Sequence, residues 1–367
     1  MDTPRYTPLV TALPATVPFV GPETQERAAG RPFRARLGAN ESLFGPSPAA
    51  VAAMRSAAAE AWMYGDPEAW DLRVAIAARH GVSPAHVVAG EGIDGLLGVL
   101  VRLVVGPGDP VVTSDGAYPT FNFHVAGAGG ALHRVPYRGH HEDPVALVAR
   151  AREVGAKLVY LANPDNPMGS HHAGAVIEGM IDTLPHGTLL ALDEAYLDLA
   201  PPGTAPVVAP DDPRVIRLRT FSKAQGLAGL RVGYGLAAPG LVSAFDKLRN
   251  HFGLGRVAQA GALAALSDTA HLERVRAAVV RARADFGATA MKNGLEPLES
   301  ATNFLTMDTR RDGTHARALR DALVARGVFV RMPFVAPLDR CIRVTLGPAE
   351  AAETFAEVLP QALADLG

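Results

Sequence analysis

A lysine, a serine and an arginine with complementary chemistry occur together in the second half of the chain. Lys223 and Ser222 follow a run that predicts a strand, and Arg231 comes eight residues after the lysine. A primary amine can form an imine with an aldehyde, whereas a hydroxyl and a guanidinium can bind a phosphate. The three residues therefore suit a ligand that carries both groups, although a strand-end lysine alone would be interpreted as solvated.

Two further polar segments follow predicted strands. Asp193 ends one strand, Tyr196 comes three residues later, and Asn166 lies in the turn after another strand. A carboxylate beside a pyridine nitrogen keeps it protonated, and Tyr or Asn can donate to a ring oxygen. Because the ends of parallel strands converge on one crevice, these groups together indicate pyridoxal phosphate (PLP). Each alone would indicate less, since Asp193 is also a plausible helix cap and Asn166 a plain turn residue.

A glycine-rich loop allows three interpretations. Residues 90–95 read G-x-G-x-x-G between a predicted strand and a predicted helix, and Asp115 follows Gly95 by 20 residues. This pattern matches the dinucleotide fingerprint and favours an NAD-dependent oxidoreductase. A glycine loop at a helix N-terminus binds any phosphate equally well, including that of PLP, and a purely structural turn is also compatible.

Apolar runs and helical patterns must position these residues. The runs lack alternation, so they predict strands covered on both faces, as in a mostly parallel sheet. They cover residues 86–89, 110–114, 157–162, 188–193, 215–220 and 232–236. Helices are predicted over residues 48–60, 71–80 and 94–105. Together these elements predict an α/β fold with a mostly parallel sheet covered by helices.

The pattern changes near residue 270 and predicts a smaller α+β domain. Its expected helices cover residues 270–292, 314–326 and 349–366, and its expected strands cover 303–307, 328–332 and 341–345. The first 35 residues are rich in proline and turn residues, which predicts an extended arm. The expected organisation is an arm over 1–35, a large domain over 36–265 and a small domain over 266–367.

Composition narrows the cellular context. The net charge of −2 gives no global attraction to nucleic acid or to an anionic membrane. The single cysteine, Cys341, excludes an intrachain disulfide and is interpreted as a small buried residue. The N-terminus does not have the pattern of a signal peptide, and the apolar run over residues 96–105 is too short for a membrane span. A cytoplasmic protein without nucleic-acid or membrane partners is expected.

These motifs together resemble the fold-type I aminotransferases, specifically the branch that contains histidinol-phosphate aminotransferase. The resemblance runs from residues 37–42, Leu-Gly-Ala-Asn-Glu-Ser, to residues 341–347, Cys-Ile-Arg-Val-Thr-Leu-Gly. It implies that Lys223 holds PLP as a Schiff base, that Asp193 pairs with the pyridine nitrogen, and that Tyr196 and Asn166 bind the ring oxygen. It further implies phosphate binding by Ser222, Arg231 and the backbone of Gly92, Ile93 and Asp94.

Other residues take expected roles from the same resemblance. Tyr118 falls where the family stacks an aromatic ring on the cofactor, with a core tyrosine as the alternative. Tyr64 resembles the tyrosine that reaches the phosphate of the neighbouring subunit, which implies a homodimer with shared active sites. Arg343, Arg331 and Asn40 are expected to bind substrate, since guanidinium groups suit carboxylate and phosphate.

The resemblance implies transamination, in which the freed Lys223 removes the proton from the α-carbon of the donor. Phe19 stands where the family has a tyrosine that binds the substrate phosphate, so an ordinary amino acid, such as an aromatic one, competes with histidinol phosphate as donor. The expected second pair is glutamate and 2-oxoglutarate. Asn250, His251 and Arg256 either touch the substrate or form a polar link between domains.

Several other activities share parts of this pattern. A PLP-dependent decarboxylase of the threonine-phosphate type and other PLP lyases use the same constellation, and an NAD-dependent oxidoreductase is a distant alternative. A PLP-binding regulator would need a DNA-binding domain, which the short arm before residue 37 does not provide.

Overall fold

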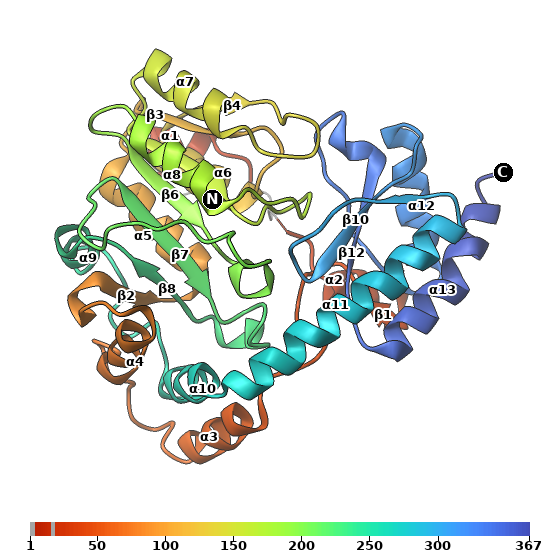
Figure 1. Cartoon of the computed structure of the whole chain (residues 1–367), viewed down its shortest axis with the longest axis horizontal. Helices are drawn as coiled ribbons and strands as arrows, with labels where there is room; N and C mark the ends of the chain where they lie inside the picture. Colours follow the sequence, from red (N-terminus) through yellow and green to blue (C-terminus); the bar gives the residue numbers. More distant parts are fainter. Residues whose placement is uncertain (1–3, 16–18) are drawn as a thin grey trace.

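The computed structural model describes residues 4–15 and 19–367 of the chain. Two layered units lie side by side, and the long helix α11 (Thr269–Lys292) leads from one to the other (Figure 1). The first unit contains a seven-stranded sheet in the order β2-β8-β7-β6-β5-β3-β4. Its pairings are parallel except those of β8, which is antiparallel to both neighbours, so the predicted mostly parallel sheet is confirmed.

Most strands of this sheet lie where the apolar runs predicted them. They are β2 (Val87–Gly90), β3 (Pro110–Ser114), β4 (Ala131–Val135), β5 (Leu158–Ala162), β6 (Leu189–Asp193), β7 (Val215–Thr220) and β8 (Gly233–Leu236). Strand β4 was missed, because its half-exposed residues do not form an apolar run. It forms the edge of the sheet, where burial on both faces is not required.

Helices cover both faces of the sheet. Successive side chains of β5 point to opposite faces, so Leu158 and Tyr160 join one core while Val159 and Leu161 join another. The first core includes α5 (Gly92–Val104), α6 (Pro119–Gly127) and α9 (Pro239–Phe245), and the second includes α7 (Pro144–Val154) and α8 (Gly174–Thr183). A third core joins β2 and β8 to α3 (Pro48–Ala58), α4 (Trp70–His80) and α10 (Arg256–Ser267).

Local signals explain where helices begin and end. Asp143 accepts hydrogen bonds from two backbone amides at the start of α7, and Pro144 follows at the first helical position. Gly155 ends α7 in a left-handed conformation with φ of 64°. These signals lie in the sequence itself, which is why helix positions are easier to predict than strand partners.

The second unit packs helices against a small antiparallel sheet in the order β12-β10-β9. Its elements are α11, β9 (Glu296–Pro297), β10 (Phe304–Asp308), α12 (Gly313–Ala325), β11 (Val328–Phe329), β12 (Cys341–Thr345) and α13 (Ala349–Ala364). The strand predicted over 328–332 is shorter than expected, because Arg331 leaves β11 to form an isolated bridge with Arg343. Cys341 is buried, as expected.

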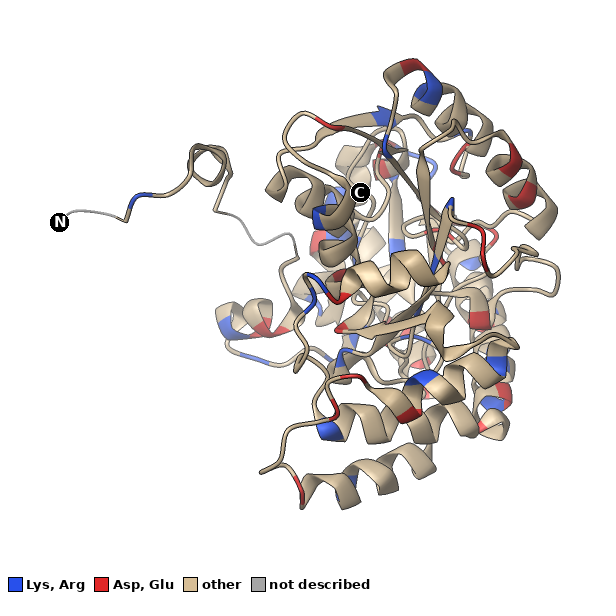
Figure 2. Ribbon diagram, turned by 90° about the vertical axis from the view of Figure 1, so that its left-hand side faces the viewer, with Lys and Arg blue, Asp and Glu red and all other residues tan. Residues whose placement is uncertain are grey.

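The N-terminal segment differs from the expected extended arm. It contains two short helices, α1 (Pro8–Ala12) and α2 (Pro22–Ala29), and its first part projects from the body (Figure 2). Arg36 binds Glu23 and Glu26 of α2, which anchors this helix. Residues 1–3 and 16–18 of the predicted arm lie outside the described residues.

The segment after the arm joins the second unit. Strand β1 (Ala35–Arg36) pairs in parallel with β11, and Leu37 is fully buried in the core of the second unit. Residues 35–37 therefore extend this core, although the sequence assigned residues 36 and 37 to the large domain. The division of the chain into domains at 35 and 265 stays a prediction. No helix of residues 4–15 and 19–367 is long and apolar enough to cross a membrane.

Candidate active site

A cavity of about 470 Å³ lies between the strand ends of the large sheet and the second unit. This volume lies within the usual range for a small-molecule site. The residues predicted to bind cofactor or substrate that line it are Asn40, Ile93, Asp94, Tyr118, Asn166, Asp193, Tyr196, Ser222, Lys223, Arg231, Arg331 and Arg343. Residues separated by about 300 positions in the chain therefore meet in one place.

The parallel sheet explains this convergence. Ala162, Asp193 and Thr220 are the last residues of β5, β6 and β7, and all three line the cavity. Because these strands run in the same direction, their carboxyl ends face the same edge of the sheet. The chain then turns at each end, which places Asn166, Tyr196 and Lys223 over this edge.

Lys223 points into the cavity from the turn after β7. Its Nζ donates a hydrogen bond to the backbone oxygen of Asn40 at 3.0 Å and lies 5.5 Å from the ring centre of Tyr196. Burial, together with the nearby positive charge of Arg343, lowers the pKa of Lys223 to about 8. The amine is therefore closer to neutrality than an exposed lysine.

Asp193 is held by two donors. Tyr160 donates its hydroxyl to Oδ2 at 2.7 Å, and the backbone amide of Ala195 donates to Oδ1 at 3.0 Å. Burial raises the pKa of Asp193 to about 6, and the hydrogen bond from Tyr160 opposes this rise. The role of Tyr160 was not predicted from the sequence, because its place in the run Leu-Val-Tyr-Leu-Ala is typical of a core residue. Only the strand register, which pairs Ala162 with Asp193, places Tyr160 beside this carboxylate.

A pocket for an anion is formed where α5 begins. Gly92, the first residue of α5, has φ of 72°, and a Cβ there would lie 2.5 Å from Nη2 of Arg231. Arg231 itself has φ of 55°, and its Nη1 lies 3.4 Å from the hydroxyl of Ser222. A positive φ at arginine costs free energy and is typical of functional sites. The left-handed φ therefore favours glycine at residue 92, and the first amides of α5, a hydroxyl and a guanidinium lie together there.

Two side chains border this anion pocket. Tyr118 donates its hydroxyl to Asp94 at 2.8 Å, and the Asp94 carboxylate lies 3.7 Å from Arg231. Burial raises the pKa of Tyr118 well above its usual range, so its hydroxyl stays protonated. Tyr118 also packs against the core, and its stacking on the cofactor stays a prediction.

The wall contributed by the second unit is rich in polar groups. Arg343 donates to the side-chain oxygen of Asn166 and to the backbone oxygen of Gly38, and its buried Nε has no partner among the described residues. The side-chain amide of Asn40 donates to the Tyr196 hydroxyl at 3.1 Å. Burial lowers the pKa of Arg343 and raises that of Tyr196.

Arg331 lies beside Arg343 at the mouth of the cavity. Its guanidinium lies 4.5 Å from the ring centre of Phe19 and 5.5 Å from that of Phe334, and Nη1 donates to the oxygen of Val20. Burial and the charge of Arg343 lower its pKa to about 10. Within residues 4–15 and 19–367, Arg331 and Arg343 form no ion pair with a carboxylate. The described chain thus supplies no carboxylate within ion-pair distance of either guanidinium group, which suits an anionic ligand.

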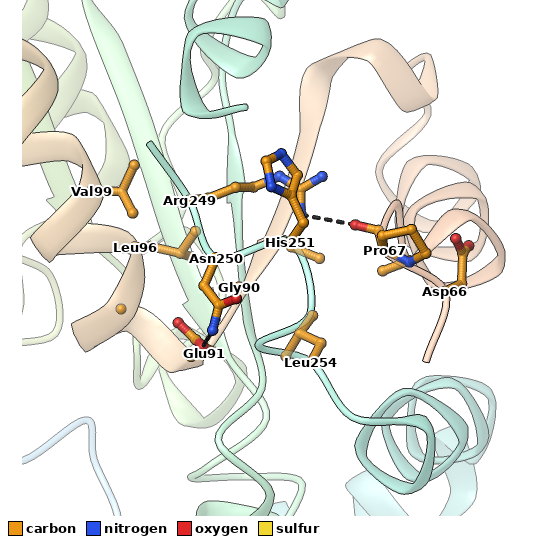
Figure 3. A pocket seen from close by; sticks show the side chains of 13 residues that line it. Asp66, Pro67, Gly90, Glu91, Leu96, Val99, Arg249, Asn250, His251 and Leu254 are labelled. Carbon is orange, nitrogen blue, oxygen red and sulfur yellow. Dashed lines mark hydrogen bonds between the residues drawn. The ribbon is translucent and has the colours of Figure 1, made fainter. Parts of the chain in front are cut away.

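Some candidate residues lie elsewhere. Tyr64 is 79% exposed, packs against Phe252 in a tilted arrangement with ring centres 4.7 Å apart, and does not line the cavity. Asn250 and His251 line a separate small pocket beside the start of α5, where Asn250 donates to Glu91 (Figure 3). Arg256 donates to Glu60 and to the backbone of Tyr64. Within one chain, these residues form polar links and do not reach Lys223.

The dinucleotide interpretation of the glycine loop depends on Asp115. This carboxylate lies 3.8 Å from Arg134 and does not line the cavity. The loop itself faces Arg231 and Ser222. It therefore opens toward the lysine, as the PLP interpretation requires.

Comparisons with known proteins agree with this arrangement. The model of the family "Aminotransferase class I and II" matches residues 35–359. Histidinol-phosphate aminotransferase of Anaeromyxobacter sp. is 37% identical over 347 residues, which are 94% of this chain and 95% of the relative. The enzyme of that name from Moorella thermoacetica is 33% identical over 365 residues, which are 98% of this chain and 94% of the relative.

A solved structure gives the same result. The crystal structure of histidinol-phosphate aminotransferase from Sinorhizobium meliloti in complex with pyridoxal 5'-phosphate is 50% identical and superposes with a TM-score of 0.97. It covers 100% of this chain, and this chain covers 99% of it. The aspartate aminotransferase of Thermus thermophilus with maleate, 23% identical with a TM-score of 0.79, shares the fold. The chain therefore belongs to the class I and II aminotransferases, the PLP-dependent transaminases of fold type I.

Proposed function

We propose that this aminotransferase moves the amino group of histidinol phosphate to a 2-oxo acid, with 2-oxoglutarate as acceptor and PLP bound at Lys223. The observation that carries this proposal is the pair Arg331 and Arg343, which line one wall of the cavity without a carboxylate partner in the described chain. Two guanidinium groups suit a phosphate on the donor and a carboxylate on the acceptor. The activity of the relatives supports the same donor.

The residues of the cavity fit the parts of PLP. A buried amine, a buried carboxylate, and the Ser222–Arg231 pair beside the start of α5 supply the three kinds of group that the cofactor needs. The Cβ that Gly92 lacks would occupy space beside Arg231. We assign the aldehyde partner to Lys223, the pyridine nitrogen to Asp193, and the ring oxygen to Tyr196 and Asn166. We assign binding of the phosphate to Ser222, Arg231 and the backbone of residues 92–94, and stacking on the ring to Tyr118.

The chain's own groups then explain proton movement. When bound, PLP supplies an electrophilic carbon and a ring that accepts electron density from the substrate. Lys223, whose pKa is lowered to about 8, removes the proton from the donor's α-carbon. The same amine then returns the proton to the carbon of the cofactor. Asp193, fixed by Tyr160 and Ala195, keeps a ring nitrogen protonated. Arg343 orients the carboxylate of the 2-oxo acid, and Asn40 positions Tyr196.

A homodimer with shared active sites is part of this proposal. Aromatic side chains are exposed near Tyr64, where Trp62 is 82% and Phe252 is 55% accessible. Such a patch is more apolar than a free surface usually is, and it suits a second copy of the chain. In the dimer, Tyr64 would reach the phosphate in the partner's cavity. We also propose a cytoplasmic location, which the single cysteine supports.

An aromatic amino acid is the second candidate donor. Phe19 and Phe334 flank Arg331 and present apolar surface at the mouth of the cavity. Phe19 lacks a hydroxyl that could bind a phosphate. An aromatic ring would contact these side chains without using Arg331.

The test is a single-turnover screen followed by absorbance. The purified protein with PLP is mixed with histidinol phosphate, an aromatic amino acid or glutamate, and conversion to pyridoxamine phosphate is measured. The proposal expects fast conversion with histidinol phosphate and glutamate. Loss of carbon dioxide without pyridoxamine phosphate would contradict it and indicate a decarboxylase. For the dimer, mixing Lys223→Ala and Tyr64→Phe proteins is expected to form mixed dimers with one intact site.

A further inference from the structure

Two buried carboxyl groups, those of Glu142 and Asp165, interact with each other close to residues that line the cavity. Glu142 precedes the first turn of α7, and Asp165 lies in the turn after β5, next to Asn166. Each is only 2% exposed. In the described part of the chain, neither forms an ion pair with lysine, arginine or histidine. The assigned roles of the cofactor site use neither of them.

Each carboxyl oxygen of the two groups accepts one hydrogen bond. Glu142 accepts from the Ser114 hydroxyl at 2.6 Å and from the Ala162 amide at 2.9 Å. Asp165 accepts from the Tyr137 hydroxyl at 2.9 Å and from the Met168 amide at 3.0 Å. The pair thereby ties the ends of β3 and β5 to the turn that carries Asn166.

Two adjoining buried carboxyl groups cannot both be ionised without a cation between them. Burial raises the pKa of Glu142 well above its usual range, and the nearby Asp165 adds to the rise. Burial also raises the pKa of Asp165, to about 7, but hydrogen bonds from Met168, Tyr137 and Glu142 and the charge of Arg343 oppose the rise. Among the described residues, the positive charge of Arg343 acts on Asp165, and it favours an ionised Asp165 and a protonated Glu142.

Asp165 lies where its charge acts on the substrate site. Its neighbour Asn166 accepts a hydrogen bond from Arg343, whose buried Nε has no partner among the described residues. The backbone oxygen of Pro167 accepts from Thr306 of β10 at 2.7 Å, so the same turn is also fixed to the second unit. An anion at Asp165 stabilises the charged form of Arg343 without forming a direct ion pair with it.

We propose that Glu142 and Asp165 share one proton, held by Glu142, and that the Asp165 anion positions Asn166 and serves as the buried counter-charge of Arg343. Glu142 and Asp165 are thus positioning residues for carboxylate binding. This inference rests on the proposed function only in taking the cavity as the cofactor and substrate site. It holds for any donor whose acceptor is a 2-oxo acid.

The test contrasts two isosteric variants. Gln has the shape and neutrality of protonated Glu, so Glu142→Gln is expected to keep KM for 2-oxoglutarate within about twofold of wild type. Asp165→Asn removes the anion, so KM is expected to rise about tenfold while kcat changes less. Asp115→Asn, a half-exposed carboxylate paired with Arg134, is the matched control and is expected to leave KM unchanged.

A second readout does not depend on activity. Infrared difference spectra of the holoprotein variants against wild type report the C=O band of a buried protonated carboxyl. The band is expected to vanish in Glu142→Gln and to persist in Asp165→Asn. The reverse pattern, or an unchanged KM in Asp165→Asn, would overturn the inference. If Asp165→Asn does not fold, Tyr137→Phe weakens the anion instead and is expected to raise KM in the same direction, and an unchanged KM there would also contradict the inference.

The two proposals fail in different ways. Failure of histidinol phosphate to convert bound PLP to pyridoxamine phosphate would contradict the proposed function and leave the infrared result on the holoprotein interpretable. Normal transamination with the reversed infrared pattern would contradict only the assignment of the proton.

Discussion

The side-chain nitrogen of Lys223 donates a hydrogen bond to the backbone oxygen of Asn40 at 3.0 Å. Asn40 in turn donates its backbone amide to Thr345 of β12, two residues from Arg343. Asn303 donates to the same oxygen of Asn40. One residue thus connects the lysine of the large sheet with the strand that carries the proposed substrate arginine.

The backbone of Asn40 leads to the first prediction. Its φ is 57°, a conformation that asparagine and glycine adopt more readily than alanine. Asn40→Ala is therefore expected to unfold at lower urea concentration than Asn40→Gly, by about 1 kcal/mol in free energy of unfolding. Both variants lose the hydrogen bond to Tyr196 and are expected to lose activity to the same extent. Equal stability of the two would contradict the role of the left-handed backbone.

A second prediction concerns the pH dependence of PLP uptake. Only the neutral amine attacks an aldehyde, and the pKa of Lys223 is lowered from 10.5 to about 8. In stopped-flow absorbance, the rate of PLP attachment to the cofactor-free protein is expected to rise with pH and level off above about 8. Arg343→Met removes one cause of the lowered pKa of Lys223. The midpoint of the curve of attachment rate against pH is therefore expected at higher pH in this variant. A wild-type midpoint above 10 would rule out an activated lysine.

A third prediction concerns Tyr160. Its hydrogen bond opposes the effect of burial on Asp193, so Tyr160→Phe is expected to raise the pKa of that carboxyl further. A carboxyl with a raised pKa is ionised less often and therefore pairs less often with a protonated ring nitrogen, and an unsatisfied carboxylate oxygen costs about 1–3 kcal/mol. The dissociation constant for PLP, measured by fluorescence quenching, is expected to rise about tenfold. Wild-type affinity in this variant would show that Tyr160 is only a core residue.

A fourth prediction separates the two arginines. Arg331→Leu is expected to raise KM for histidinol phosphate about 100-fold, as loss of a charged partner for the phosphate would. KM for 2-oxoglutarate, whose carboxylate is assigned to Arg343, is expected to change much less. Phe19→Tyr restores a hydroxyl near Arg331 and is expected to lower KM for histidinol phosphate. Equal effects of Arg331→Leu on both substrates would refute the division of roles.

Much of this site follows from the sequence, because parallel strands bring polar strand ends together. Asp193 ends an apolar run, Lys223 follows another, and the glycine loop precedes a helix, so the convergence of these groups on one crevice was predictable. Tyr160 and Glu142 were not. Tyr160 occurs inside a buried run, and Glu142 stands in the polar segment His-His-Glu-Asp, which indicates an exposed loop.

Both missed residues depend on contacts between distant segments. Glu142 is buried only because Ser114 and Ala162 are brought to it by the sheet. A contact between distant segments also explains why β11 is shorter than predicted. Arg331 forms an isolated bridge with Arg343 and does not continue the pairing of β11 with β1. Local patterns identify elements and their ends, whereas register and tertiary pairing decide which polar residues become buried.

The absorption spectrum of the protein with PLP during a half-reaction with histidinol phosphate tests the central claim most directly. Wild-type protein is expected to show a band near the visible edge that disappears on addition of histidinol phosphate, as pyridoxamine phosphate forms. Lys223→Ala is expected to lack that band and to turn over no donor at a measurable rate. If Lys223→Ala consumed histidinol phosphate at the wild-type rate, or if wild type did not respond to it, the account of this cavity would be wrong.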